Sequence, residues 1–381
     1  MDTDKLSAIS NWLISGAPPN SDSNAPIAEL AQRLVDSGVG LEMLGVYALA
    51  INPLARGRVI TWTPRSGVRR QDWTHEMMSS PEFVGSIAEA CVFGKRLIRY
   101  RIGENPTFDQ NEGSLPLIRR GYTEFLAIPL IGMHGNNGVF GVATTRSEGF
   151  TEEEVPALRR IAAPLARIVE AQTQRENMQV LLATYVGEDA SARVLAGQVR
   201  RGGAEVIPAV ILFADLVGFT KLSNTETPEV AIRVLNQFFA AMDASIRKYG
   251  GEVLKLIGDG LLAIFPTPDD LTAQQAAAAN ALLALEEANE CFRNTSIDFR
   301  GGLNLGDIHY GNIGSESRLD FTAIGPAVNL TSRILATADE LGEKFVCTEM
   351  FSQLLPGRSA LKGSFEFKGF ADAQPVYSLE I

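Results

Sequence analysis

The sequence predicts an α+β protein with two globular domains joined by a long helix, on the basis of three observations. The chain has 381 residues, which is enough for two domains that each bury a core. After an initial helical segment, short apolar runs separated by Gly, Pro and Asn indicate a mixed sheet. From Ala204 onward the pattern changes to strand, helix, hairpin and helix, which indicates a second and different domain.

Composition shifts and breaker residues divide the chain into four segments. The first residues are polar and include Pro18 and Pro19, which favour a loop. Apolar positions then recur at helical spacing from Ile27 to Val35. The predicted segments are a flexible lead-in (1–24), a first domain (25–150), a linker helix (151–184) and a second domain (185–381).

The linker is predicted to begin at Thr151, which has the character of an N-cap because three glutamates follow it in the first turn. Apolar residues recur from Val155 to about Leu182, and Pro164 lies inside this pattern. Two interpretations remain open. The helix either pairs with its copy in a dimer or folds back on the first domain.

Composition limits which partners the protein can bind and in which cellular compartment it is expected. The formal net charge of −11 argues against a nucleic-acid-binding protein. Three distant cysteines, at positions 91, 291 and 347, favour a reducing compartment over a disulfide framework. The sequence shows neither the pattern of a signal peptide nor a run of ~18 apolar residues. We therefore expect a cytoplasmic protein with no membrane span.

Two aspartates occupy unusual positions. Asp215 ends an apolar strand, and Asp259 lies between Gly258 and Gly260 in the turn of a hairpin. Either residue alone is explained by a local turn. If the strand and hairpin are neighbours in one sheet, the two carboxylates lie within ~4 Å and repel by roughly 1–4 kcal/mol. A pair of Mg²⁺ ions would remove this cost and would supply two-metal phosphoryl chemistry.

Longer motifs around these aspartates are similar to those of class III adenylyl/guanylyl cyclase catalytic domains, in the same order and spacing. The resemblance covers roughly residues 185–381. It departs from the family at Asn304, where many relatives have His, and we expect little loss of function from this change. The motifs are FADLVGFT, KLIGDGLLAIF, RGGLNLGDIHYGNIG, DFTAIGPAVNLTSRI and FEFKGF.

The resemblance implies a ferredoxin-like, palm-type domain that converts ATP to 3′,5′-cyclic AMP and pyrophosphate. It assigns two divalent ions per site, Mg²⁺ or Mn²⁺, to Asp215, Asp259 and the carbonyl of Leu216. Gly218, Phe219 and Thr220 follow the first aspartate and precede a helix, so their N–H groups are expected to contact the phosphates.

Four further polar residues match family positions that act on the nucleotide. Arg300 and Lys368 resemble the residues that pair with the triphosphate. Asn329 and Arg333 resemble the pair that orients the ribose and stabilises the transition state. Because these last two are four apart, a helix would place them on one face.

The resemblance assigns recognition of the base to Lys255 and Thr322. A lysine offers only donors, which suits N1 of adenine and not the N1–H of guanine. A threonine hydroxyl can accept from the adenine amino group but can also donate to guanine. Guanylyl cyclases typically have Glu and Cys here, so ATP is the predicted substrate. The alternatives are a guanylate cyclase, or a catalytically silent cyclase-like module that binds nucleotide.

The resemblance also implies a homodimer, because the metal aspartates of one protomer would meet the base-reading residues of another. Two identical composite sites would result. The first domain resembles a GAF sensor domain in its order of elements. A small molecule or a protein is its expected signal, and the linker helix is expected to pass that signal to the catalytic domain.

Overall fold

The structure is a computed structural model that describes every residue except 1, 18–24, 51–52, 54 and 134. The chain divides into two compact units, residues 1–181 and residues 182–381, which we describe separately. Both contain helices and sheet, so the α+β prediction is confirmed. No helix among the described residues has the length and hydropathy that crossing a bilayer requires.

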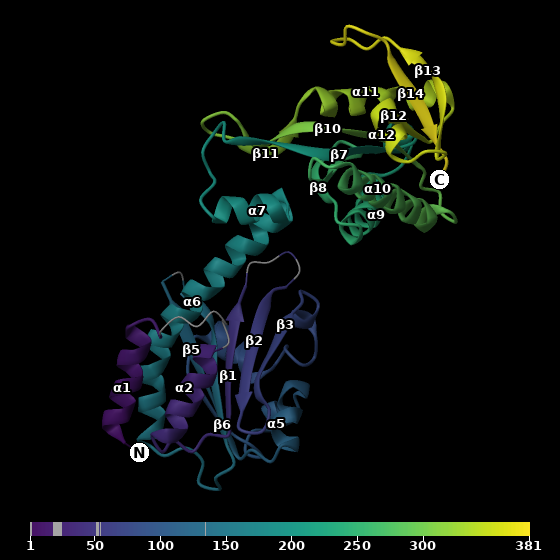
Figure 1. Cartoon of the computed structure of the whole chain (residues 1–381). Helices are drawn as coiled ribbons and strands as arrows, with labels where there is room; N and C mark the ends of the chain where they lie inside the picture. Colours follow the sequence, from purple (N-terminus) through teal and green to yellow (C-terminus); the bar gives the residue numbers. More distant parts are fainter. Residues whose placement is uncertain (1, 18–24, 51–52, 54, 134) are drawn as a thin grey trace. The chain divides into compact units, whose positions relative to one another are not determined.

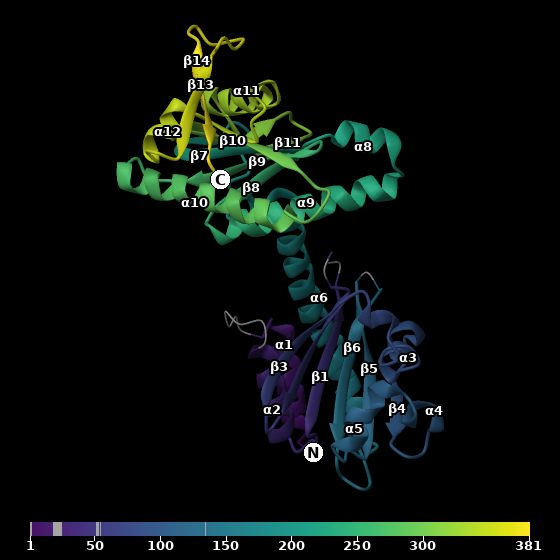
Figure 2. The same cartoon turned by 90° about the vertical axis from the view of Figure 1, so that its right-hand side faces the viewer.

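The first unit contains a six-stranded antiparallel sheet in the order β3-β2-β1-β6-β5-β4. Helices α1, α2 and α6 cover one face, and α3 to α5 lie on the other (Figures 1 and 2). The strands are β1 (Met43–Leu49), β2 (Gly57–Thr63), β3 (Gly67–Trp73), β4 (Ile98–Arg101), β5 (Glu124–Gly132) and β6 (Gly135–Thr144). The helices are α1 (Thr3–Ile14), α2 (Ala25–Asp36), α3 (Ile87–Gly94), α4 (Pro106–Asp109), α5 (Leu115–Arg119) and α6 (Glu154–Val186), with 3-10 turns at Met77–Ser79 and Glu112–Ser114.

The first residues differ from the predicted flexible lead-in, because they form helix α1. The Asp2 side chain caps it by accepting from the backbone N–H groups of residues 4 and 5. Leu6, Ile9 and Leu13 are at most 5% exposed and pack into the core of the unit. Their spacing of three and four residues is the helical signal that the polar surroundings obscured. The proline-rich part, 18–24, lies outside the described residues.

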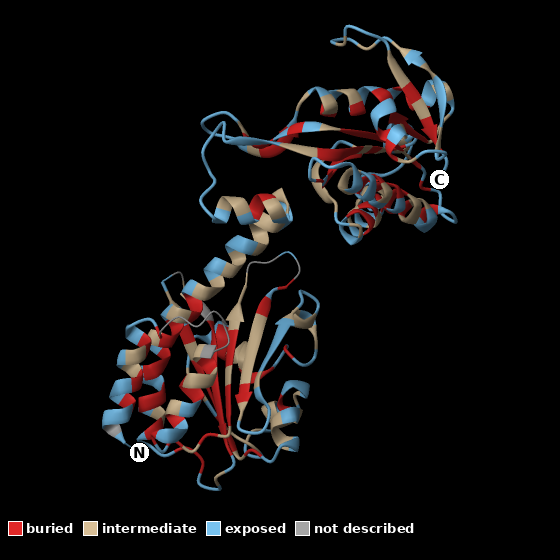
Figure 3. Ribbon diagram, viewed as in Figure 1, coloured by how far each residue is buried: buried red, intermediate tan, exposed pale blue. Residues whose placement is uncertain are grey.

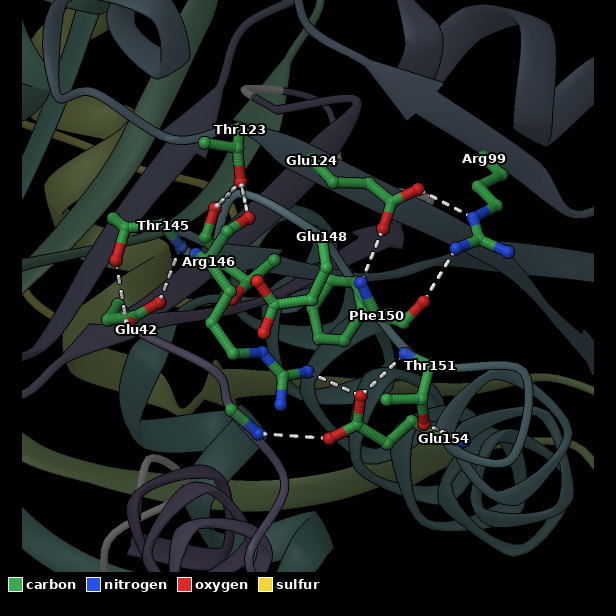
Figure 4. Close-up of polar contacts among 12 residues, drawn as sticks. Glu42, Arg99, Thr123, Glu124, Thr145, Arg146, Glu148, Phe150, Thr151 and Glu154 are labelled. Atoms are coloured by element: carbon green, nitrogen blue, oxygen red, sulfur yellow. Dashed lines mark hydrogen bonds and ion pairs between the residues drawn. The ribbon is translucent and has the colours of Figure 1, made fainter.

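Helix α6 begins at a network of polar contacts (Figure 4). Thr151 and Glu154 exchange hydrogen bonds: the Thr151 N–H donates to the Glu154 carboxylate at 2.8 Å, and the Glu154 N–H donates to the Thr151 hydroxyl at 3.2 Å. This is a capping box, so the predicted N-cap is confirmed. Arg146 and the N–H of Gly40 also bind the Glu154 carboxylate, which fixes the helix to the sheet.

The two halves of α6 have different surroundings within the chain. Leu158, Ile161 and Leu165 are at most 1% exposed and lie in the core of the first unit. From residue 171 onward the helix is half-buried or exposed (Figure 3). The first half therefore folds back on the domain. The second half is less buried, although Glu176 within it still pairs with Arg58 of β2.

The second unit contains an eight-stranded sheet in the order β13-β14-β12-β10-β7-β9-β8, with β11 pairing to β10. Its strands are β7 (Ala204–Leu216), β8 (Glu252–Ile257), β9 (Gly260–Pro266), β10 (Phe299–Gly314), β11 (Leu319–Ile324), β12 (Phe345–Thr348), β13 (Ser359–Phe365) and β14 (Gln374–Leu379). Its helices are α7 (Glu188–Leu195), α8 (Phe219–Thr225), α9 (Pro228–Lys248), α10 (Leu271–Phe292), α11 (Pro326–Leu341) and α12 (Glu349–Leu354).

Alternate residues of the central strands of this sheet enter two separate hydrophobic cores. Leu212 of β7 faces α9 and α10 in what we call the α9–α10 core, and Ile211 faces the opposite side in the α7 core. The α9–α10 core includes Ala214, Leu216, Phe238, Leu261, Leu285 and Phe299. The α7 core includes Ala190, Leu262, Ile308, Tyr310, Phe321, Ala323 and Val328, with Val186, Val194 and Leu254 packed against it.

Candidate active site

Asp215 and Asp259 lie at the same end of two neighbouring strands. Asp215, near the end of β7, pairs in register with Gly260, the first residue of β9. The N–H of Leu216 donates to the backbone carbonyl of Asp259 at 3.2 Å. The hairpin turn therefore lies directly beside the end of β7, which is the arrangement that would bring the two carboxylates together.

The environment of Asp215 combines burial with opposing charges. Arg300 lies opposite it on β10, and the Arg300 Nε donates to Asp215 Oδ1 at 2.7 Å. Burial raises the pKa of Asp215; the bond and charge of Arg300 lower it, while the Asp259 charge raises it. The net direction is upward, so Asp215 is a carboxylate that a bound cation would stabilise.

Arg300 has a second acidic partner that the sequence did not suggest. Its Nη1 forms an ion pair with Asp339 near the end of α11. This aspartate lies on the exposed face of the helix, where acidic residues are common. The pair fixes the Arg300 side chain between the β7 aspartate and α11.

The loop after Asp215 turns sharply into helix α8. Gly218 is the N-cap of that helix and has a φ of +74°, which a side chain would strain. Gly218 and Phe219 line a cavity of about 280 Å³ that also includes Lys221. Thr220 is exposed in the first turn of the helix. Backbone N–H groups at this helix start suit an anionic group.

Lys255 on β8 forms an ion pair with Asp320 on β11. Asp320 lies two residues before Thr322 on the same strand, so both project from one face of it. Thr322 is 8% exposed. Asp320 was not among the predicted residues, although its two-residue spacing from Thr322 on a strand was a signal that could have found it.

Helix α11 places Asn329 and Arg333 on one face, and both side chains are exposed. Lys368 is exposed in the connection between β13 and β14. Among the described residues, no hydrogen bond or ion pair joins these three or Lys255 to Asp215 or Asp259. Within the described part of the chain, the candidate residues therefore form two groups with no hydrogen bond or ion pair from these four residues to the two aspartates.

Comparison with known proteins identifies the region that holds all of these residues. Residues 205–375 match the family of adenylate and guanylate cyclase catalytic domains. This segment is a class III cyclase catalytic domain. The match includes every predicted site residue, from Asp215 to Lys368, and stops short of the first unit.

The relatives of this cyclase domain include uncharacterized proteins from mycobacteria. One from Mycobacterium tuberculosis (strain ATCC 25618 / H37Rv) is 30% identical over 173 residues, which are 45% of this chain and 32% of the relative. One from Mycobacterium bovis is 31% identical over 176 residues, 45% of this chain and 31% of the relative. The chain spans about a third of the length of these curated relatives.

Solved structures similar to the cyclase domain include an adenylyl cyclase and a guanylyl cyclase. The adenylyl cyclase CyaB from P. aeruginosa is 27% identical with a TM-score of 0.40, covering 47% of this chain and 96% of that one. The guanylyl cyclase Cya2 is 29% identical with a TM-score of 0.39, covering 46% of this chain and 93% of that one.

Proposed function

We propose that the chain is an adenylate cyclase that converts ATP to 3′,5′-cyclic AMP and pyrophosphate. The observation that supports this most directly is the position of Asp259 beside the end of β7, next to Asp215, within a cyclase catalytic domain. In the proposed reaction the ribose 3′-oxygen attacks the α-phosphorus in line, and pyrophosphate leaves. Positioning and charge stabilisation supply most of the catalysis.

Two Mg²⁺ or Mn²⁺ ions would be held by the carboxylates of Asp215 and Asp259 and by the carbonyl of Leu216. Oxygen donors are the ligands that these ions prefer. Among the residues that the structure describes, no three His, Cys, Asp or Glu side chains cluster as a ready metal site. The substrate phosphates would therefore complete the coordination, as is usual for Mg²⁺. When bound, the ions would help ionise the 3′-hydroxyl and neutralise the triphosphate.

The remaining residues would bind and orient the substrate. Arg300 and Lys368 would pair with the triphosphate, and the N–H groups at 218–220 would contact its oxygens. Asn329 would orient the ribose, and Arg333 would stabilise the charge that develops on the phosphate during the reaction. Both side chains are exposed on one face of α11, where a substrate can reach them.

ATP is the proposed substrate because Lys255 and Thr322 suit adenine. The Lys255 ammonium donates to N1, and the Thr322 hydroxyl accepts from the amino group. The Lys255–Asp320 pair supports a fixed ammonium position. A site built to bond particular polar groups rejects a base that leaves them unpaired, so ATP should be preferred to GTP.

A homodimer would bring together the two groups of residues that a single chain keeps apart. Apolar side chains next to them support an interface: Leu256 and Ile257 on β8 are 54% and 48% exposed, and Ile324 on β11 is 49% exposed. Exposed apolar residues clustered near functional groups are typical of association surfaces. A head-to-tail pair would contain two identical composite sites.

The first unit is the proposed GAF-like sensor. A cavity of about 360 Å³ lies between its sheet and the helices α3 and α5. Gly45 and Gly141 pair across β1 and β6 on its floor, and Tyr47, Trp73 and Phe125 contribute aromatic surface. A small molecule of largely apolar character would fit there, although a protein signal is the alternative. Cysteines 91, 291 and 347 are free, which supports a cytoplasmic location.

Product analysis tests the proposal. The purified chain is mixed with ATP or GTP and with Mn²⁺ or Mg²⁺, and cyclic nucleotide is measured by chromatography. We expect cyclic AMP to form faster than cyclic GMP, and no product from Asp215→Ala. Faster cyclic GMP formation would make the chain a guanylate cyclase, and no product with either ion would indicate a silent nucleotide-binding module.

Regulation by the first unit is tested by deleting residues 1–150. An unchanged rate of cyclic nucleotide formation in all conditions would exclude a sensor role.

A further inference from the structure

The candidate residues at the metal end are anchored in the α9–α10 core. Asp215 lies between Ala214 and Leu216, and both of these neighbours are buried there. Arg300 directly follows Phe299, which is fully buried in the same core. Because a close-packed core permits little movement, these neighbours fix the backbone that presents the Asp215–Arg300 pair.

The residues proposed to contact the base and ribose are anchored in the other core. Thr322 lies between two residues of the α7 core, and Lys255 and Asn329 each directly follow a residue that packs in it or against it. These anchoring residues are Phe321, Ala323, Leu254 and Val328. The two groups of the proposed composite site therefore depend on different cores of one domain.

Helix α7 is a structural part of this second core. Ala190 and Ser191 are 1% and 4% exposed, and Val194 packs against the α7 core. The helix follows α6 after Gly187, where a positive φ of +93° ends α6 and changes the direction of the chain. Movement of α7 would consequently act directly on the α7 core, and on the α9–α10 core only through the strands that the two cores share.

Polar contacts join α7 to the start of β8 and to the end of α9. The N–H of Asp189 donates to Glu252 Oε1 at 3.0 Å, while Arg247 of α9 pairs with Glu188 at 2.6 Å in an exposed ion pair, which contributes little. The pairing of β8 with β9 shifts between Val253 and Lys255, so Leu254 is the extra residue of a bulge. A bulge redirects the side chains beside it, and here it immediately precedes Lys255.

From this arrangement we propose that α7 positions the base-reading half of the site selectively, through Glu252 and the Leu254 bulge. The inference rests on the proposed function, because it concerns residues proposed to bind the nucleotide. A displacement of α7 would reorient Lys255 and the β11 strand that holds Thr322, while the Asp215–Arg300 pair would keep its geometry. The linker would thus regulate substrate binding and base choice, and not metal binding.

Neighbouring residues on one strand supply a matched test in the full chain. Leu254→Ala and Val194→Ala loosen the α7 core, while Val253→Ala loosens the α9–α10 core. We expect the first two to raise the KM for ATP roughly threefold or more and to lower the preference for ATP over GTP. The Mn²⁺ concentration for half-maximal activity should stay unchanged in both. Val253→Ala should leave the KM and the base preference at their wild-type values.

Hydrogen exchange adds a readout that does not require turnover. In Val194→Ala, exchange should accelerate in residues 252–257 and 319–324 and stay unchanged in residues 210–216. The proposal would be overturned if Val253→Ala raised the KM for ATP as much as Leu254→Ala does. It would also be overturned if exchange in residues 252–257 and 319–324 stayed at the wild-type rate. If the wild-type chain makes no cyclic nucleotide, the proposed function fails, but the exchange experiment still tests the role of α7.

Discussion

At the scale of single residues, Asp215 is held between opposing influences. Burial and the neighbouring Asp259 raise its pKa, and Arg300 lowers it through a 2.7 Å bond. A carboxyl with a raised pKa keeps its proton to a higher pH, and a protonated carboxyl binds cations poorly. Metal-dependent activity should therefore be lost on the acid side of neutrality as Asp215 takes up its proton.

Replacing Arg300 by Gln should move the acid limb of the pH–activity profile, where activity is lost as Asp215 is protonated, to higher pH. The reason is that the Arg300 charge and hydrogen bond, which lower the Asp215 pKa, are removed. The measurement is kcat/KM against pH at a fixed Mn²⁺ concentration below saturation, and activity should also fall because a triphosphate contact is lost. Arg293→Gln is the control, since Arg293 lies 70% exposed in a surface pair with Glu290. An acid limb that stays in place or moves to lower pH would contradict this explanation.

Asn304 shows why a departure from the family pattern can be structural. Its side chain is 2% exposed, donates to the carbonyl of Ala327 at 3.0 Å and accepts from the Thr348 hydroxyl at 2.6 Å. Asn304→Ala removes both bonds and leaves the buried Thr348 hydroxyl without its acceptor, so we expect a loss of about 1–3 kcal/mol in the free energy of unfolding. Denaturant titration measures it, with exposed Asn294→Ala as the control. Equal stability of the two variants would show that these bonds contribute nothing.

At the scale of elements, the start of α6 depends on a buried carboxylate. Glu154 is 2% exposed. Burial alone would raise its pKa, but bonds from Arg146 and from the N–H groups of Thr151 and Gly40 outweigh this and lower it. A lowered pKa means that Glu154 stabilises the fold above its unfolded-state pKa. That stability is lost as pH falls through the folded-state pKa.

Glu154→Ala should destabilise the first unit by about 3 kcal/mol at pH 7, because Arg146 loses its partner and the capping box is lost. The variant should also lose less stability than wild type on acidification. Thermal unfolding at pH 7 and at pH 4 measures both effects. Glu152→Ala is the control, since that side chain is 89% exposed. Equal loss from the two variants at pH 7 would exclude a special role for the buried carboxylate.

Local patterns predicted the elements that present the aspartates, and contacts between distant segments account for what was missed. The apolar run ending at Asp215 and the glycines around Asp259 each specify a local structure. The bulge at Leu254 and the Lys255–Asp320 pair depend on β8 lying near β9 and β11. Helix α1 was missed because its apolar positions are sparse among polar residues.

At the scale of the whole molecule, the proposed site requires two chains. Asp259→Ala damages the metal half, and Arg333→Ala damages the transition-state half, so each variant alone should be inactive. Mixing them should restore up to about a quarter of the wild-type activity, because half of the chains form heterodimers with one intact site. Cyclic AMP formation after mixing measures this, with affinity tags to confirm heterodimers. Heterodimers without activity would exclude a site shared between protomers.

The proposed function depends on Asp215 and Asp259 together holding divalent cations beneath a nucleotide. Mn²⁺ binding to the purified chain, measured by electron paramagnetic resonance with a non-cyclisable ATP analogue, tests it most directly. We predict two bound ions per site in the wild-type chain, and loss of both tight sites in Asp215→Ala and Asp259→Ala with the fold intact. Unchanged Mn²⁺ stoichiometry and affinity in both variants would show that these two carboxylates do not hold the ions.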